Sequence, residues 1–351
     1  MMFHRRSGTL DAELTAMNEC MPHYYRITLG HGQGAELLMN AEAAFMQGNF
    51  SDAQILLEQT YSTIASNGQH NISLCCDFLA ARLSLFQESV TFVKNPEVKR
   101  KELLSLHNMM WLNIFDSTYA YYYALIRMPE KIPALFKDHM LSTVSFLSPC
   151  RPMMEMIENQ VFLSQKMYAK VIGRSETLLP VCEKMHYELV SLHVQIQTAA
   201  AYAMLGKHHD ARQLLQKALG HAMPDGFLIP FVENYNYIKD VLGSINSITP
   251  EPFTDRILSL GSVYEQHCLR LSSRNSRPEI LNMLNSREAE IAALITDRLS
   301  NREIAERLFL SEGTVKQYVN QIYSKLMING DTRTKRKQLA ELISSINKGL
   351  T

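Results

Sequence analysis

The periodicity of the apolar residues most constrains how this chain can fold. Across its 351 residues we find no run of alternating apolar and polar residues long enough to form a convincing β-strand. Alanine, leucine, methionine and glutamine are plentiful, whereas glycine and proline number only 15 and 12. The sequence therefore predicts an all-α protein, and its 46% of apolar residues are enough to build more than one core.

A short motif recurs within the first 245 residues. GNFSDA at 48–53 matches GKHHDA at 206–211, and a weaker copy, KMYAKV, occupies 166–171. Each copy is followed, at the same two spacings, by a pair of matching positions. These are Leu57 and Thr60 after the first copy, Leu215 and Ala218 after the second, and Ser175 and Leu178 after the weaker one. In a helix pair, glycine ends the first helix and a small residue lets the second approach its neighbour. The motif predicts divergent tetratricopeptide-like repeats, and an irregular helical bundle is the alternative.

Two breaks separate this region from the rest of the chain. TPEP at 249–252 should interrupt a helix, and SSRNSRP at 272–278 is polar, basic and ends in proline, as in a linker. We therefore expect three parts. They are a helical-repeat sensing or interaction region at 1–245, a linker with one helix at 246–278, and a small C-terminal domain at 279–351.

Composition excludes several classes of function. The 35 basic and 35 acidic residues balance, so no global charge points to nucleic acid or a membrane. With no apolar segment for export or membrane insertion, we expect a cytoplasmic protein with reduced cysteines. The six cysteines and twelve histidines show no metal-binding spacing, and no catalytic motif appears. We therefore expect no metal, no other cofactor and no enzymatic activity.

Capping and periodicity divide residues 284–326 into three helices. Ser286 and Asn301 are predicted to cap the first two, and Ser311 the third, which would span about 312–326. Apolar residues recur on the third helix at positions that share one face, namely Val315, Val319, Ile322 and Leu326.

The opposite face of this third helix carries Lys316, Gln317, Asn320 and Ser324. A lysine can bind guanine O6 and N7, and an amide can pair with adenine, so a helix of this kind suits the major groove of DNA. A solvated helix face would use the same residue types. The residues alone therefore leave DNA binding and simple solvation open.

The stretch resembles the LuxR-type helix-turn-helix family. The matching residues are Leu284, Arg287, Glu288, LSNREIA at 299–305, Leu308, SEGTVK at 311–316, Ile322, Lys325 and Leu326. The resemblance implies base or groove contacts from Lys316, Gln317 and Asn320. It implies phosphate contacts from Asn301, Arg302, Thr314, Tyr318 and Lys325. Three residues depart from the usual pattern, namely Arg298 and Met327 in place of glycine and Tyr318 in place of histidine.

This resemblance implies a sequence-specific transcription regulator that binds double-stranded DNA as a dimer, with RNA polymerase as a further candidate partner. The residues expected to pair two copies form an apolar stripe on the last helix, Leu339, Leu342, Ile343 and Ile346. Packing of that stripe within its own domain is the alternative.

The helical part resembles the repeat region of MalT-like regulators. The residues that carry this resemblance are MPHYYR at 21–26, GHGQGAE at 30–36 and LIPFVEN at 228–234. The ATP site of that family has no counterpart, because no GxxxxGK[ST] motif occurs. We expect the repeats to bind an unidentified small-molecule or protein effector. A helical-repeat receptor whose C-terminal domain does not bind DNA is the alternative function.

Overall fold

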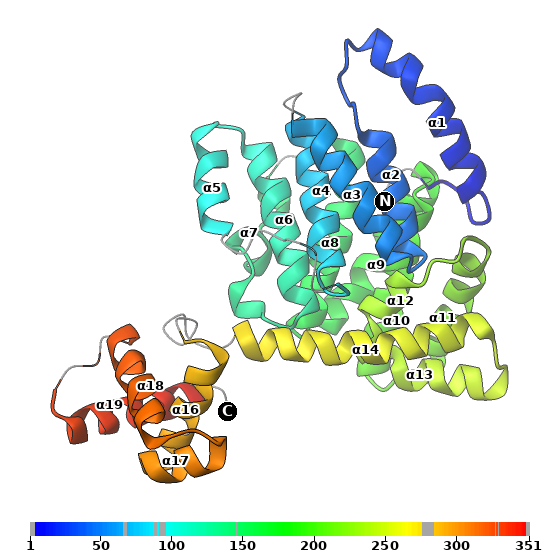
Figure 1. Ribbon diagram of the computed structural model, residues 1–351. Helices are drawn as coiled ribbons and strands as arrows, with labels where there is room; N and C mark the ends of the chain where they lie inside the picture. The colour runs from blue at the N-terminus through cyan, green and yellow to red at the C-terminus, as the bar shows by residue number, and fades with distance from the viewer. Residues whose placement is uncertain are drawn as a thin grey trace. The chain divides into compact units, whose positions relative to one another are not determined.

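The computed structural model describes residues 4–65, 69–87, 90, 96–144, 146–275, 284–326, 328 and 330–348. Within these ranges the chain forms helices and turns and no β-strand (Figure 1), which confirms the all-α prediction. None of the helices described there has the length and apolar character that a membrane span needs. The chain divides into two compact units, Met1–Leu269 and Arg270–Thr351, and we treat each by itself.

The first unit, here called the helical unit, holds most of the helices, and the last of them, α14, continues past the end of the unit at Leu269. They are α1 (Leu10–Ile27), α2 (Ala35–Met46), α3 (Phe50–Ala65), α4 (His70–Leu83), α5 (Pro96–Ser105), α6 (Met109–Leu125), α7 (Ala134–Lys137), α8 (Arg151–Ser164), α9 (Tyr168–Met185), α10 (Glu188–Met204), α11 (His208–Ala222), α12 (Ile229–Glu233), α13 (Tyr235–Ile248) and α14 (Pro252–Asn275). Four short 3₁₀ turns lie at Pro129–Lys131, Leu141–Thr143, Ser148–Cys150 and Met223–Asp225.

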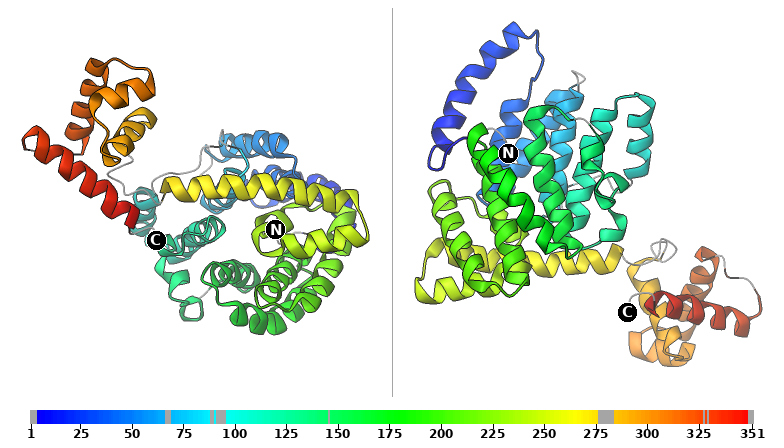
Figure 2. Two further views of the ribbon diagram at one scale, coloured as in Figure 1. Left: turned by 90° about the horizontal axis from the view of Figure 1, so that it is seen from below. Right: turned by 180° about the vertical axis from the view of Figure 1, so that it is seen from behind.

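The recurring motif marks three helix pairs, α2–α3, α8–α9 and α10–α11. The second and third pairs pack on each other, whereas α4 and α6 lie between α3 and α8 in the curved array of helices (Figure 2). Each first helix is followed by a residue with positive φ, Gly48 at 80°, Lys166 at 61° and Gly206 at 74°. The aligned motif positions on the second helices are all buried, namely Ala53, Leu57, Thr60, Val171, Ser175, Leu178, Ala211, Leu215 and Ala218. The recurrence in sequence therefore corresponds to a recurrence in packing, as helical repeats require.

A charged pair lies in the core of the helical unit. Arg82 on α4 donates from Nε and Nη2 to Oε1 and Oε2 of Glu233 on α12, at 2.7 and 3.0 Å. The hydroxyl of Tyr121 on α6 donates to Oε2 of the same carboxylate at 2.8 Å. The side chains of Arg82 and Glu233 are only 1% and 0% exposed, so the pair joins three helices out of reach of solvent.

The single tryptophan, Trp111 on α6, also belongs to the helical unit. Its indole Nε1 donates to the side-chain oxygen of Asn71 at 2.6 Å, and its ring lies 4.7 Å from that of His70. These contacts attach one end of α6 to the start of α4.

Helix α14 packs one face on the rest of the helical unit. The buried residues of that face are Thr254, Ile257, Gly261, Tyr264 and Cys268, spaced so that they lie on one stripe. At Gly261 a Cβ would come within 2.3 Å of the ring of Tyr235 on α13, so only glycine permits this approach. Close contact between the two helices therefore depends on a residue that would weaken an isolated helix.

We predict that Gly261→Ala destabilises the protein by about 1–3 kcal/mol, because the added methyl group displaces the ring of Tyr235. Gly243→Ala on α13 is the matched control, since nothing lies within 4 Å of its Cβ position. That control should stabilise by about 0.5–1 kcal/mol through helix propensity. Denaturant unfolding followed by circular dichroism measures both, and equal effects of the two substitutions would contradict the packing argument.

Candidate nucleic-acid interface

The second unit contains α16 (Ser286–Thr296), α17 (Asn301–Leu308), α18 (Glu312–Lys325) and α19 (Thr332–Lys348). All four helices contribute to one small core, whose fully or nearly fully buried members include Ile291, Ile304, Val315, Ile322 and Leu339. The short turn between α17 and α18 gives the pair the geometry of a helix-turn-helix. In helix-turn-helix proteins bound to DNA, the second helix of the pair is the one that enters the major groove, and α18 occupies that position in the pair.

The helix caps differ by one residue from two of the predictions. Asn285, not Ser286, caps α16, and Ser300, not Asn301, caps α17. Both cap residues have extended backbones, and each exchanges two hydrogen bonds with the glutamate three residues on. Neighbouring polar residues can each serve as a cap, so sequence does not decide between them. The prediction for Ser311 is confirmed, since its hydroxyl accepts from the Thr314 N–H at 3.0 Å.

The two faces of α18 differ as predicted. Its apolar stripe is buried, and comprises Val315, Val319, Ile322 and Leu326. The opposite side is exposed, and comprises Lys316, Gln317, Asn320 and Ser324. One lysine and two amides are therefore presented together on a helix whose other side is fixed in the core.

A buried carboxylate holds the end of α18 to the start of α16. Oε2 of Glu288, whose side chain is 1% exposed, accepts from Lys325 Nζ at 2.7 Å. The same oxygen accepts from the Asn285 N–H at 2.8 Å as part of the cap. Burial alone would raise the pKa of Glu288, but the hydrogen bonds from Lys325 and Asn285 and the positive charge of Lys325 lower it. Lys325, a predicted phosphate contact, thus also has a positioning role that its sequence pattern did not reveal.

Two arginines fix the neighbouring helices. Arg287 donates to the backbone oxygen of Leu308 at 2.8 Å and so attaches the end of α17 to α16. Arg336 on α19 donates to the backbone oxygen of Leu299 and, at 2.9 Å, to Oδ1 of Asn301. Asn301, another predicted phosphate contact, is therefore partly engaged within the domain. These arginine contacts join residues far apart in sequence, which explains why no local pattern indicated them.

The other three residues predicted to contact phosphate differ in their exposure and in the contacts that hold them. Arg302 is largely exposed and forms a surface ion pair with Glu306 at 3.2 Å. The hydroxyl of Thr314 lies 2.8 Å from that of Ser311, at the start of α18. Tyr318 is half-buried and packs against the domain core. Arg302 and Thr314 are thus held by local contacts only.

Two turn residues adopt the left-handed conformation that favours glycine. Arg298, between α16 and α17, has φ of 64°, which gives a physical reason for glycine at this position in the family pattern. Phe309, between α17 and α18, has φ of 55° and is 95% exposed. The other departure in a turn, Met327, lies outside the described residues.

The last helix contributes to its own domain. Leu339 is fully buried in the core of the second unit, and Leu342 is half-buried against that core. The side chains of Ile343 and Ile346 lie outside the described residues. For Leu339 and Leu342 the structure therefore gives the intradomain packing that the sequence left open, and pairing of two copies through this helix remains a prediction.

Comparison with known proteins places the second unit in a family. Residues 282–336 match the family model of bacterial regulatory proteins, luxR family. The C-terminal part is a LuxR-family helix-turn-helix domain. Within the described residues, no group of three or more histidine, cysteine, aspartate or glutamate side chains could hold a metal ion beside this domain or elsewhere.

Several curated regulators share similarity with the chain. Transcriptional regulatory protein LnrK of Bacillus subtilis (strain 168) is 44% identical over 110 residues, which cover 31% of this chain and 49% of LnrK. Transcriptional regulatory protein DegU of Brevibacillus brevis is 45% identical over 53 residues, or 15% of this chain and 22% of DegU. The DNA-binding transcriptional activator DevR/DosR of Mycobacterium tuberculosis is 35% identical over 57 residues, or 16% and 26%.

The chain thus spans about half or less of the length of these relatives. No solved structure matches it significantly. The family assignment therefore applies to the LuxR-type domain, and the match to MalT-like regulators over the helical unit has no support from these comparisons.

We predict that Glu288→Gln weakens the LuxR-type domain by about 1–3 kcal/mol at pH 7, because it removes the negative charge of the buried carboxylate that accepts from Lys325. The pKa of Glu288 is lowered on folding, so its contribution is full above the unfolded pKa and is lost as pH falls through the folded value. Parent and variant should therefore become more alike as the pH is lowered below about 4.

Hydrogen exchange of the α16 and α18 amides in the full chain, corrected for the intrinsic effect of pH, measures this difference. Glu341→Gln is the control, because its ion pair with Lys337 at 3.7 Å is largely exposed and should contribute little. A loss that is the same for Glu288→Gln and Glu341→Gln, or independent of pH, would argue against the positioning role of Glu288.

Proposed function

We propose that this protein is a sequence-specific DNA-binding transcription regulator, with α18 as the recognition helix in the major groove. The observation that carries the proposal is the exposed row of Lys316, Gln317 and Asn320 on a helix whose opposite face is buried. The membership of this unit in the luxR family supports it. The names of the relatives, which describe transcriptional regulators, agree with it.

The side chains suit a division between base reading and positioning. Lys316 would donate to guanine O6 and N7, and the amides of Gln317 and Asn320 would pair with adenine. Phosphate contacts would come from Asn301, Arg302, Thr314, Tyr318 and Lys325. The Lys325 side chain remains 41% exposed, so its ammonium group can donate to a phosphate while it holds Glu288.

We infer that the N-terminal and C-terminal parts of the chain have different functions, with the boundaries that we predicted from the sequence. Residues 279–351 would bind double-stranded DNA, residues 1–245 would bind an effector or partner protein, and residues 246–278 would join them. The separate cores of the two units, Met1–Leu269 and Arg270–Thr351, support a division between an N-terminal and a C-terminal part of the chain, though not these exact limits. Pairing of two copies on DNA and contact with RNA polymerase are further elements of the proposal.

Lys316→Ala and Asn320→Ala should each weaken binding to a selected operator by about 1–3 kcal/mol, because each removes a contact to a base edge. Helical content should not change, since both side chains are exposed. Gel-shift titrations with DNA selected by the parent protein measure the effect. Lys101→Ala on α5, which removes an equal charge from the helical unit, is the control.

The same titrations at low and moderate salt separate the two classes of function. A DNA-binding regulator must bind more weakly as salt rises, because phosphate contacts release counterions. If no selected DNA binds with this salt dependence, the C-terminal domain serves another partner and the proposal is wrong. If the parent binds but both α18 variants bind equally well, the groove assignment alone is wrong.

A further inference from the structure

Residues 4–10, here called the N-terminal strap, are fastened to the helical unit by one buried carboxylate. Asp225 accepts from the backbone N–H of Gly8 at 2.6 Å and from that of Leu10 at 3.0 Å. The ring of His4, itself 1% exposed, lies 3.4 Å from the same carboxylate. These contacts join segments that are more than two hundred residues apart in sequence.

Further hydrogen bonds extend the strap across two repeat helices. The Ser7 hydroxyl donates to the backbone oxygen of His221 on α11 at 2.7 Å. The Glu188 N–H at the start of α10 donates to the backbone oxygen of His4 at 3.1 Å. Because the strap is held on both sides, the backbone positions of Arg5 and Arg6 between these contacts are fixed.

Both arginines line a cavity of about 390 Å³ in the helical unit, together with residues of α9, α10 and α11. Lys217 on α11 provides a third cation there. The backbone N–H of Arg5 donates to Oε1 of Glu13 at 3.0 Å, but in the part of the chain that the structure describes the side-chain nitrogens of Arg5, Arg6 and Lys217 have no carboxylate within 4.0 Å. The lining holds two carboxylates, Glu183 and Glu188, against these three cations. The cavity thus gathers more positive charge than its own residues neutralise.

The side-chain oxygen of a buried amide at this cavity also lacks a hydrogen-bond partner. Gln195 on α10 lines the cavity and is only 5% exposed. Its Nε2 donates to the hydroxyl of Ser191 at 3.1 Å, but its Oε1 has no hydrogen-bond partner. A buried acceptor that stays unpaired costs free energy, so a ligand with a hydroxyl or ammonium donor would satisfy it.

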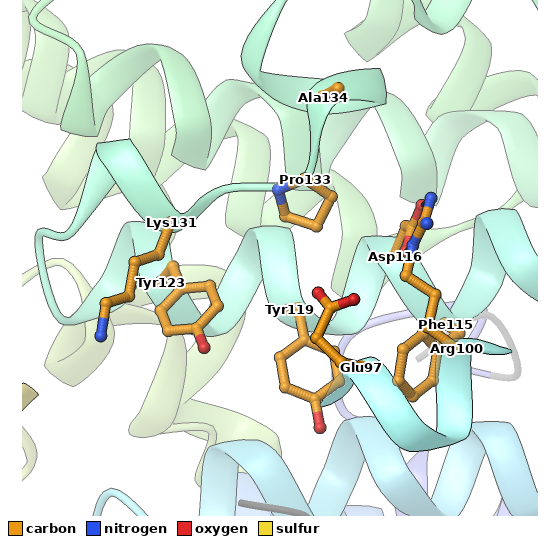
Figure 3. A pocket seen from close by; sticks show the side chains of 9 residues that line it. All are labelled: Glu97, Arg100, Phe115, Asp116, Tyr119, Tyr123, Lys131, Pro133 and Ala134. Atoms are coloured by element: carbon orange, nitrogen blue, oxygen red, sulfur yellow. Dashed lines mark hydrogen bonds and ion pairs between the residues drawn. The ribbon is translucent and has the colours of Figure 1, made fainter. Parts of the chain in front are cut away.

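In a second pocket of the helical unit, of about 400 Å³, the charge of the arginine is neutralised by a neighbouring carboxylate (Figure 3). One wall carries three aromatic rings of α6, Phe115, Tyr119 and Tyr123. Its arginine, Arg100, is paired through two nitrogens with Asp116, at 3.0 and 3.1 Å. That pocket offers no such surplus of unpaired cations, so the comparison singles out the cavity beside the strap.

We propose that the cavity between the N-terminal strap and helices α9 to α11 binds a small hydroxylated organic anion, with a carboxylate or phosphate group held by Arg5, Arg6 and Lys217. Guanidinium groups bind both kinds of anion through paired hydrogen bonds, so the cavity suits either. A hydroxyl group of the ligand would donate to Gln195. The cavity volume is that of a site for a small metabolite.

Calorimetric titration of the full chain, without DNA, tests this proposal independently of the regulator function. The probes are glycerol 3-phosphate, malate and inorganic phosphate at one ionic strength, with glycerol as the neutral control. We expect glycerol 3-phosphate or malate to bind and raise the melting temperature, glycerol to do neither, and inorganic phosphate to bind more weakly than the hydroxylated anions. The tighter of the two hydroxylated probes identifies the anionic group.

Arg5→Gln/Arg6→Gln should weaken binding of the hydroxylated anion about tenfold or more, because two charge-assisted contacts are lost. The strap itself should stay in place, since its fastening uses neither arginine side chain. Lys101→Gln/Lys184→Gln removes the same charge at exposed positions outside the cavity and should keep the parent affinity.

Gln195→Leu separates the hydroxyl contact from the charge contacts. It should weaken binding of the hydroxylated anions and leave that of inorganic phosphate unchanged. The proposal is overturned if no anion binds, or if the Arg5→Gln/Arg6→Gln variant binds as tightly as the parent. Equal affinity for inorganic phosphate and for glycerol 3-phosphate would overturn the assignment of a hydroxylated ligand.

Discussion

The ion pair between Arg82 and Glu233 is the contact on which the helical unit depends. An arginine and a glutamate lose most of their hydration when they are buried, and close pairing through direct hydrogen bonds must offset that loss. Here two direct hydrogen bonds and a third from Tyr121 satisfy the carboxylate, and the guanidinium also lies 4.9 Å from the ring centre of Phe45. Since the partners are 151 residues apart, the pair exists only when the early and late helices have assembled. We infer that the helical unit forms as one cooperative structure, not as independent repeats.

In the LuxR-type domain, polar contacts likewise join helices that lie apart in the sequence. A recognition helix must be presented in one orientation, and a core of short helices constrains it weakly along its axis. Glu288 addresses this by capping α16 and holding Lys325 at the end of α18 with the same side chain. Arg336 does the equivalent for the turn before α17. The exposed row on α18 is therefore positioned by polar contacts at the helix ends as well as by the apolar core.

Local sequence patterns predict much of this architecture. Helical periodicity placed the buried stripe of Val315, Val319 and Ile322, and the motif shared by 48–53 and 206–211 identified two true helix pairs. The caps at Asn285 and Ser300 differed by one residue because adjacent side chains can compete for the same N–H groups. The pairs Arg82–Glu233 and Glu288–Lys325 and the strap held by Asp225 could not be predicted, since each joins residues that only the folded chain brings together.

The position of the lone tryptophan gives the two units separate optical signatures. Trp111 reports only on the surroundings of α4 and α6, so indole fluorescence follows the melting of the helical unit and does not register the LuxR-type domain. Far-ultraviolet circular dichroism registers the helices of both units. Superimposable transitions from the two probes would mean that the units unfold together, whereas separated transitions would make a single unfolding free energy for the chain undefined. One residue therefore allows the coupling between the two units to be measured without labelling.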